Sequence, residues 1–318
     1  MTLRKAAVRA LVVVVGVPLV LLVVAAGWYY ARFYAWHRAD HTIVSSGRRR
    51  EYLLYVPRDY DRAHRAPLVI SLHGAMMWPA AQRETSQWNR VADAHGFLVV
   101  YPSGTTLGGE GTGVLPRVWR MGPETALSAD VGFIADLIDT LEAAYHVDPA
   151  RIYVTGFSNG GGMAFALSCT LSQRIAAVGT VAAAQSLPWS WCPNTRPVPM
   201  ITFHGTRDRL VPYGGALPSL MSPRPLPPVA TWVAGWARRN RCDPDPADSA
   251  VTAGVTRRAY GSCGGGASVV LYTVRGGGHT WPGGGAMPAW LLGPTTREID
   301  ASALMWEFFA AHPLADGR

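Results

Sequence analysis

The segment GFSNG at residues 156–160 is the first candidate for chemistry in this sequence. It follows a β-branched run at 151–155 that predicts a strand, and a helical stretch comes after it. A Gly-x-Ser-x-Gly segment between a strand and a helix makes a sharp, strained turn that exposes the serine hydroxyl. Chance matches are common in a chain with 34 glycines, but this context favours chemistry. We therefore predict that Ser158 is a nucleophile.

A serine nucleophile needs a base within hydrogen-bond reach and a carboxylate that orients the base. On α/β folds with this turn, the chain order is serine, then acid, then histidine. Asp208 follows an apolar strand predicted at 198–203, and His279 follows a strand predicted at 268–274. Because ligands and chemistry gather at the carboxyl ends of parallel strands, we predict that Asp208 is the acid and His279 the base.

Other aspartates and histidines compete for these roles. Asp208 could simply be a turn residue. Its main rival is Asp130, which is more simply interpreted as the N-cap of a helix predicted at 131–145. His73 and His204 each precede a glycine directly after a strand, which indicates that they shape turns.

Hydrolysis through an acyl intermediate also requires two backbone N–H donors for the developing oxyanion. One is expected at Asn159, directly after the nucleophile. The second is expected in the loop after a strand predicted at 67–72, from Ala75 or alternatively Met76. Trp281, beside the base, and Met76 are predicted to contact substrate, with burial in the core as the alternative for the tryptophan.

The elements around these residues alternate between strands and helices. Strands are expected at 68–72, 97–101 and 151–155, after an antiparallel hairpin at 42–56. Apolar residues at helical spacing in 133–145 indicate an amphipathic helix. This alternation predicts an α/β fold with a mostly parallel sheet and helices on both faces. We expect a single catalytic domain from 41 to 318.

The last helix, predicted at 300–311 with Asp300 as its N-cap, is expected to pack on the sheet beneath the His279 loop. Two irregular stretches, 104–118 and 214–228, are rich in glycine or proline. They are expected to be either lids over the site or plain surface loops.

Residues 1–40 differ from the rest of the chain. Three basic residues precede an apolar stretch at 10–30, which is about 20 residues long and so of membrane-spanning length. The positive-inside rule places the N-terminus in the cytoplasm. A signal anchor is favoured over a signal peptide cleaved near 24–26, because a signal core usually has only about 7–15 apolar residues. Both interpretations predict export.

The formal net charge is +8, and five of the basic residues precede the first acidic residue, Asp40. The exported part therefore carries only +3, without a basic stripe of the kind that binds nucleic acid. Composition thus gives no reason to expect a nucleic-acid partner.

Four cysteines suit an exported protein, because disulfides persist outside the cytosol. They allow three pairings, and the absence of a Cys-x-x-Cys spacing argues against a zinc site. Cys242 ends a helix-like segment and Cys263 begins the strand before His279, so we expect these two to pair. Cys169 and Cys192 would then form the second disulfide. Four buried free thiols are the alternative.

Taken in order, several segments resemble the polyhydroxybutyrate depolymerase and feruloyl esterase family of secreted serine esterases. The matching segments span 50–311 and are 72–74, 97–102, 130–134, 154–161, 204–213 and 276–283. The resemblance implies an α/β-hydrolase fold, no metal, and Ser158, Asp208 and His279 as nucleophile, acid and base. The apolar N-terminal segment, the 104–118 loop and a third glycine at Gly162 depart from the family pattern.

These observations predict an extracytoplasmic serine esterase without a cofactor, acting on polyhydroxyalkanoate, feruloyl or acetyl-sugar esters. Its activity is expected to fall below pH about 6.5, because the histidine base must be neutral. One alternative is an envelope acyltransferase that uses the same triad. Another is a non-catalytic surface binding protein on the same scaffold. A peptidase also stays open, because the triad can cleave amides.

Overall fold

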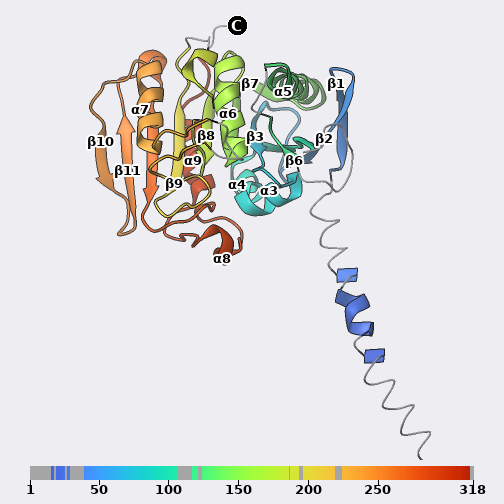
Figure 1. The fold of residues 1–318 in the computed structure, drawn as a ribbon. Coiled ribbons are helices and arrows are strands. Elements are labelled where there is room, and N and C mark those ends of the chain that lie inside the picture. The colour runs from blue at the N-terminus through green and yellow to red at the C-terminus, as the bar shows by residue number, and fades with distance from the viewer. Residues whose placement is uncertain are drawn as a thin grey trace, which may run out of the picture.

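The computed structural model describes residues 16–17, 19–25, 27–28, 39–106, 117–120, 124–185, 187–192, 196–218 and 224–315. In this part of the chain a ten-stranded sheet forms the centre, in the order β1-β2-β4-β3-β7-β8-β9-β12-β11-β10 (Figure 1). The strands from β4 to β12 in this order run parallel, while β1, β2, β10 and β11 extend the sheet through antiparallel pairs.

The strands of the large sheet are β1 (His41–Ser45), β2 (Arg48–Tyr55), β3 (Ala66–Leu72), β4 (Leu98–Pro102), β7 (Val147–Phe157), β8 (Ala177–Val181), β9 (Met200–Gly205), β10 (Ala247–Ala250), β11 (Val255–Tyr260) and β12 (Val269–Val274). A separate pair joins β5 (Thr105–Thr106) to β6 (Arg117–Val118). The helices are α3 (Pro79–Ser86), α4 (Trp88–His95), α5 (Glu124–Ala144), α6 (Asn159–Thr170), α7 (Val229–Arg239), α8 (Ala289–Leu292) and α9 (Ala301–Ala310).

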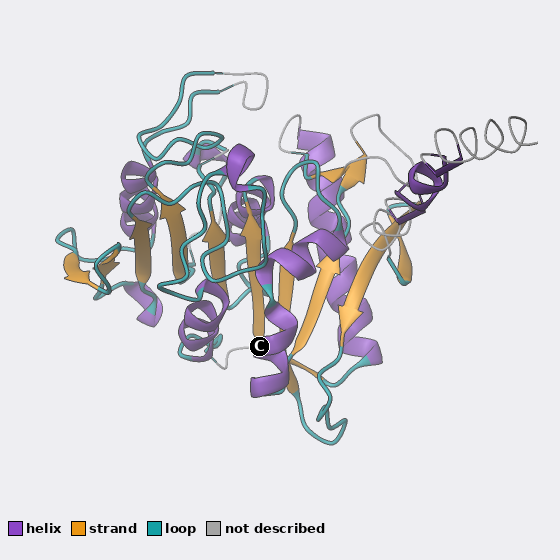
Figure 2. Cartoon of the chain, turned by 90° about the horizontal axis from the view of Figure 1, so that it is seen from below, coloured by secondary structure: helices purple, strands orange, loops and turns teal. Residues whose placement is uncertain are grey.

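Helices cover both faces of the sheet (Figure 2). Side chains of α5, α6 and α7 form one hydrophobic core with one face of the sheet, and side chains of α3, α4 and α9 form a second core with the other face. All seven residues of β3 are buried. A parallel strand covered on both sides has no polar face, which explains its continuous apolar run. The predicted α/β fold with helices on both faces is confirmed.

The expected hairpin, the five predicted strands and the last helix are all present, with shifted bounds. Asp300 caps α9 as predicted, since its Oδ1 accepts a hydrogen bond from the Ala303 N–H at 3.0 Å. This helix packs on β7, β8 and β9. The strands β8, β10 and β11 were not predicted.

The structure corrects the interpretation of Asp130 as an N-cap. Helix α5 begins at Glu124, so Asp130 lies inside it and is fully buried. Its Oδ1 accepts a hydrogen bond from Arg50 Nη2 of β2 at 2.8 Å, and its Oδ2 accepts from the Arg120 N–H at 3.0 Å. The Arg50 guanidinium also lies 4.0 Å from the Phe133 ring centroid. Asp130 therefore ties α5 to the sheet.

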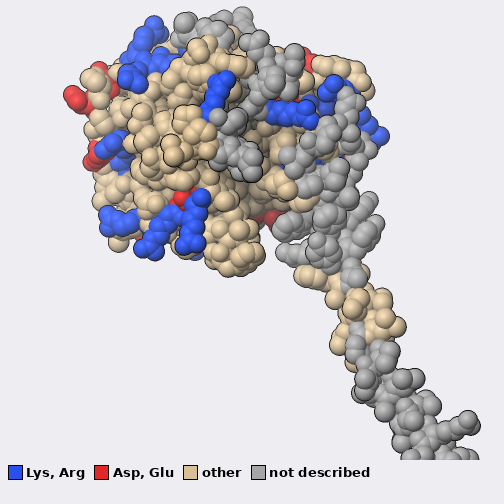
Figure 3. Space-filling view, viewed as in Figure 1, with Lys and Arg blue, Asp and Glu red and all other residues tan. Residues whose placement is uncertain are grey.

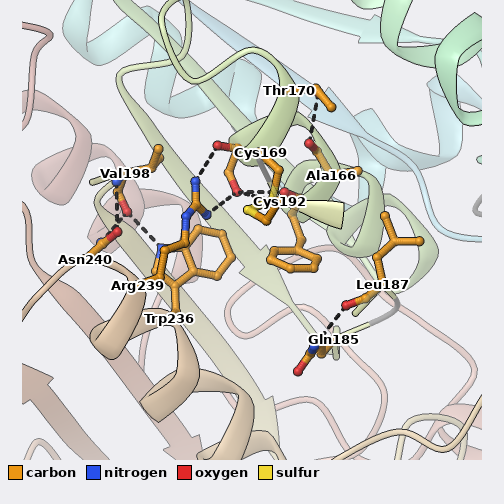
Figure 4. The surroundings of a disulfide bond; sticks show 12 residues. Ala166, Cys169, Thr170, Gln185, Leu187, Cys192, Val198, Trp236, Arg239 and Asn240 are labelled. Carbon is orange, nitrogen blue, oxygen red and sulfur yellow. Dashed lines mark hydrogen bonds between the residues drawn. A yellow bond between two sulfur atoms is a disulfide. The ribbon is translucent and has the colours of Figure 1, made fainter. Parts of the chain in front are cut away.

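Both predicted disulfides, Cys169–Cys192 and Cys242–Cys263, are formed. The first joins the end of α6 to the residue after a short 3-10 helix at Trp189–Trp191. Arg239 of α7 lies beside it (Figure 4) and donates hydrogen bonds to the carbonyl and hydroxyl oxygens of Ser168. This region thus holds the C-terminal ends of α6 and α7 together.

Much of the predicted membrane segment at 10–30 lies outside the described residues. Residues 19–25 are helical, and the apolar side chains from Leu19 to Val24 are all exposed, with Leu22 at 68%. Among the residues that the structure describes, no helix has both the length and the apolar character needed to cross a bilayer. Of the two irregular stretches, 107–116 and 219–223 also lie outside the described residues.

Replacing Arg50 by Met should lower the free energy of unfolding by about 3–5 kcal/mol, because it leaves the buried charge of Asp130 unpaired. Urea denaturation would measure the change. The exposed pair Arg258–Asp248 provides the control, and Arg258→Met should cost at most about 1 kcal/mol. Equal effects at the two sites would contradict the structural role given to Arg50.

Candidate active site

Ser158 occupies a strained turn between β7 and α6. Its backbone has φ 52° and ψ −117°, a conformation that residues with a Cβ rarely adopt. The Ser158 N–H donates to the Val181 carbonyl at the end of β8, at 2.9 Å, which fixes the turn against the sheet. Strain of this kind persists only where the surroundings impose it, and it concentrates at functional sites.

The glycines on either side of Ser158 are required by close packing. A Cβ on Gly156 would lie 2.2 Å from the Gly160 carbonyl oxygen. A Cβ on Gly160 would lie 2.4 Å from the Leu72 carbonyl oxygen of β3. Helix α6 therefore sits close enough to the sheet that any other residue at these positions would push the turn away.

Asp208 and His279 meet at the same edge of the sheet. Asp208 follows β9 and His279 follows β12, and these two strands are parallel neighbours. His279 Nδ1 lies 2.8 Å from Asp208 Oδ2, so Nδ1 carries the proton that the carboxylate accepts. Both residues are buried. The imidazole Nε2 is thereby left as the nitrogen able to accept a proton.

The buried carboxylate of Asp208 is stabilised in its ionised form. Its Oδ1 accepts hydrogen bonds from the N–H groups of Leu210 and Val211, at 2.9 and 2.8 Å. Burial alone would raise the pKa of Asp208, but hydrogen bonds from His204 and His279 hold that pKa well below its usual range. The acid is therefore charged at neutral and mildly acidic pH.

The loop of the base also contacts the turn that carries Ser158. The Phe157 ring, directly before the serine, lies 4.9 Å from the His279 ring between centroids. The His279 N–H donates to the Leu292 carbonyl of α8 at 2.6 Å. These contacts place the imidazole beside the residue that precedes Ser158. Asp208 and His279 are in direct contact, whereas within the described residues no hydrogen bond joins Ser158 to His279.

His204 is a residue whose part in the site the sequence did not indicate. It was expected to shape a turn, but its buried Nε2 lies 2.8 Å from the Val211 carbonyl and 3.4 Å from Asp208 Oδ2. Because a carbonyl only accepts, Nε2 carries a proton that both oxygens share. His204 and His279 therefore both contact the Oδ2 atom of the acid.

The loop after β3 provides the expected position for the second oxyanion donor. The Met76 N–H donates to the Arg117 carbonyl at 2.8 Å, so it is already used. Within the described residues no acceptor is found for the Ala75 N–H. The Asn159 N–H, at the start of α6, has no partner within its helix. The Asn159 side chain instead pairs with the backbone of Trp119, at 2.7 and 3.0 Å.

His73 holds this loop in place as a neutral residue. Its Nε2 accepts from the Gly104 N–H at 2.9 Å, which leaves the proton on Nδ1 to be donated to the Gly74 carbonyl at 2.8 Å. Complete burial lowers the pKa of His73 from 6.5 to about 4. His73, which was expected to shape a turn, thus holds the loop through two hydrogen bonds, and these bonds also fix the tautomer of His73.

The two residues predicted to contact substrate differ in position. Trp281 is fully buried, and its indole N–H donates to Ser302 Oγ at 3.0 Å. Trp281 is therefore a core residue, which was the alternative to substrate contact. Its ring does not form the wall of an open pocket. Met76 is 48% exposed beside Ala75, where a bound molecule could reach it.

One hollow among the described residues lies elsewhere. It has a volume of about 350 Å³ and is lined by Trp189, Cys192, Gly235, Arg238 and Arg239, near the C-terminal ends of α6 and α7. Helices between parallel strands run opposite to them, so this hollow lies away from Ser158. In the described part of the chain, no group of three or more His, Cys, Asp or Glu side chains is placed to hold a metal ion.

The mostly parallel sheet, its helices and the strained serine turn define an α/β-hydrolase fold. In solved structures, the chain resembles the acetyl xylan esterase from Aspergillus awamori, with a TM-score of 0.61 at 16% identity over 85% of this chain and 98% of that one. The family described as esterase PHB depolymerase matches residues 50–185.

Curated relatives agree with this match. The putative esterase NocK of Nocardia uniformis subsp. tsuyamanensis is 30% identical over 84% of this chain and 80% of its own length. Feruloyl esterase B of Piromyces equi is 32% identical over 72% of this chain, which spans only 42% of that enzyme. Poly(3-hydroxyalkanoate) depolymerase C of Paucimonas lemoignei is 26% identical over 68% of this chain and 55% of its own length. The chain belongs to the polyhydroxybutyrate depolymerase family of esterases.

Protonation of His73 should destabilise the fold in mildly acidic solution. Its folded pKa lies below the unfolded value, so the unfolded state binds the extra proton between pH 6.5 and about 4. The contribution of His73 is complete above pH 6.5, and about 3 kcal/mol is lost as the pH falls through this window. Urea unfolding at several pH values would measure the slope.

The variant His73→Gln cannot titrate and should show a shallower dependence of unfolding free energy on pH over this window. The matched control is His64→Gln, at an exposed imidazole. An unchanged slope in His73→Gln, with a reduced slope in His64→Gln, would contradict the neutral, buried state of His73.

Proposed function

We propose that the protein hydrolyses carboxylic esters through a Ser158–His279–Asp208 triad and an acyl-enzyme. The observation that carries this proposal is the strained turn of Ser158 at the same sheet edge as the 2.8 Å contact between His279 and Asp208. Family membership supports the ester bond as the target.

In the proposed reaction, Ser158 Oγ attacks the ester carbonyl carbon while His279 Nε2 takes the hydroxyl proton. The negative charge that develops on the carbonyl oxygen is stabilised by the N–H groups of Ala75 and Asn159. His279 then gives the proton to the departing alcohol, and the acyl group stays on Ser158. Water, activated by the same imidazole, releases the acid and restores the serine.

Asp208 has two tasks in this scheme. Its carboxylate fixes the proton of the neutral imidazole on Nδ1, which leaves Nε2 free to act as a base. It also stabilises the imidazolium that forms in the transition state. A low pKa serves both tasks, because the carboxylate then keeps its charge throughout the cycle.

The relatives are named for feruloyl, acetylxylan and polyhydroxyalkanoate esters, and these share only the carboxylic ester bond. We therefore assign the reaction to that bond in an ester of this range. Met76 is the side chain that we assign to substrate contact, because it is exposed beside the proposed oxyanion donor Ala75.

We also propose that residues 41–318 form one catalytic domain outside the cytoplasm. The two disulfides support an oxidising compartment. We assign residues 1–40 to a signal anchor or signal peptide, and the exposed apolar side chains from Leu19 to Val24 support a non-aqueous environment for this segment.

Replacing Ser158 by Ala should lower turnover of p-nitrophenyl esters by about 10³-fold or more, because the nucleophile is lost. Release of p-nitrophenol from esters between acetate and octanoate would measure it. Ser190→Ala, at an exposed serine in the 3-10 helix, should keep full activity. Turnover that survives in Ser158→Ala would refute the mechanism, and ester formation with an added alcohol in place of acid release would refute hydrolysis.

Replacing His204 by Phe should lower kcat about tenfold with little change in KM, because His204 positions Asp208 and does not touch substrate. With one donor fewer, Asp208 should attract the imidazolium more strongly, so the acid limb of the kcat/KM profile should move to higher pH. His204→Gln, which retains an N–H donor, should recover part of kcat. If kcat falls but the acid limb does not move, His204 has only a structural role and the proposed positioning role is contradicted.

A further inference from the structure

We propose that the catalytic edge of the sheet docks on an anionic phospholipid bilayer and takes its ester substrate from that surface. The inference rests on the proposed function and adds the place where the substrate is found. It is carried by the side chains that the loops around Ser158, Asp208 and His279 expose.

Large apolar side chains are exposed on the loops that carry both the acid and the base and on the loop of the proposed oxyanion hole. On α8, which binds the His279 backbone through Leu292, Trp290 is 83% exposed. We call these residues the apolar rim: Met76, Leu210, Leu217, Trp290 and Leu291. Exposed apolar residues that cluster around one site indicate an interaction surface, whereas scattered single ones are normal on a protein surface.

The same edge carries positive charge. Arg207 and Arg209 flank the acid after β9, and Arg275 follows β12. All three are exposed, and within the described residues none has a carboxylate partner. Figure 3, viewed as Figure 1, shows basic side chains beside the protrusion that α8 forms at the lower edge. An anionic bilayer attracts each such arginine by about 1 kcal/mol.

The chain that precedes the domain favours a membrane as the occupant. From Leu19 to Val24 it is helical and wholly apolar, with side chains at least 61% exposed. The domain begins at β1, where His41 pairs with Tyr52, and Tyr52 pairs with Pro102 at the C-terminal end of β4. The first strand thus enters the sheet level with the catalytic edge.

The connection between these two parts limits how far apart they can lie. From Val24 to His41 the chain can span at most about 60 Å even when fully extended. A membrane that held the apolar segment would therefore lie within reach of the catalytic edge. Tryptophan and leucine beside arginine are also the side chains that settle at the interface of an anionic bilayer.

The test uses the full chain reconstituted in vesicles of phosphatidylglycerol and phosphatidylcholine. One substrate, 4-methylumbelliferyl palmitate, is dissolved in the bilayer, and the other, 4-methylumbelliferyl acetate, is in the water. Trp290→Ser combined with Leu291→Ser should lower turnover of the palmitate about tenfold and leave the acetate within twofold. Val44→Ser, which removes a 74% exposed side chain from β1, should change neither rate.

Charge is tested separately. Arg207→Glu combined with Arg209→Glu should lower palmitate turnover about tenfold in vesicles with phosphatidylglycerol, and much less in phosphatidylcholine alone. The matched control, Arg62→Glu with Arg65→Glu, makes the same charge change just before β3, at the opposite edge of the sheet.

The outcomes separate the two proposals. If the unaltered chain hydrolyses neither ester, the proposed function fails. If it hydrolyses both, and the rim and charge variants leave the palmitate rate unchanged, the docking surface is refuted. A rim variant that loses activity on a polyhydroxybutyrate suspension but keeps its rate on the bilayer ester would assign the rim to a polymer and overturn the membrane as its occupant.

Discussion

The close approach of α6 to the sheet is the constraint on which the rest of the site depends. Gly156 and Gly160 allow the backbones of β3, β7 and α6 to pack so closely that a Cβ at either position would clash with a carbonyl oxygen. That packing imposes the positive φ on Ser158 and directs its side chain away from the sheet. The Asn159 N–H is placed beside the serine by the same turn. One close packing contact thus positions both the proposed nucleophile and one proposed oxyanion donor.

A second constraint is the buried charge of Asp208. An unpaired carboxylate in this position would be costly. Its own loop supplies two backbone N–H groups, and the imidazoles of His204 in β9 and His279 after β12 complete its partners. These partners make the acid loop rigid, and rigidity at Asp208 is passed to His279 through one hydrogen bond. The buried pair Arg50–Asp130 follows the same rule for a different purpose, because it joins a helix to the sheet.

Local patterns in the sequence predicted the parts of the structure that local patterns determine. The strand, glycine and serine order led to Ser158, and positions after strands led to Asp208 and His279, whose contact the structure shows. Long-range partners leave no such pattern. Arg50 and Asp130 are 80 residues apart, so no local pattern indicated that they pair. Asp130 was therefore predicted to cap a helix inside which it lies. The strand β8 lies in an apolar run that is rich in alanine and contains a glycine, residues with low strand propensity, and β10 is exposed at all four of its positions. Trp281 shows no local sign of the Ser302 hydroxyl that holds it in the core.

At the catalytic edge, the side chains of Asp208 and His279 are buried, whereas the apolar side chains of Trp290 and Leu291 are exposed. His279 is held through the backbone carbonyl of Leu292, so the Trp290 side chain contributes nothing to that hydrogen bond. A polar residue at position 290 would leave the geometry of the base unchanged and would suit water better. The exposed indole is therefore explained better by contact with a binding partner than by a role in the site. The arginines beside the acid give the same surface its positive charge. Under the proposed docking, the loops that position the proposed catalytic residues are also the loops that determine where the ester is bound.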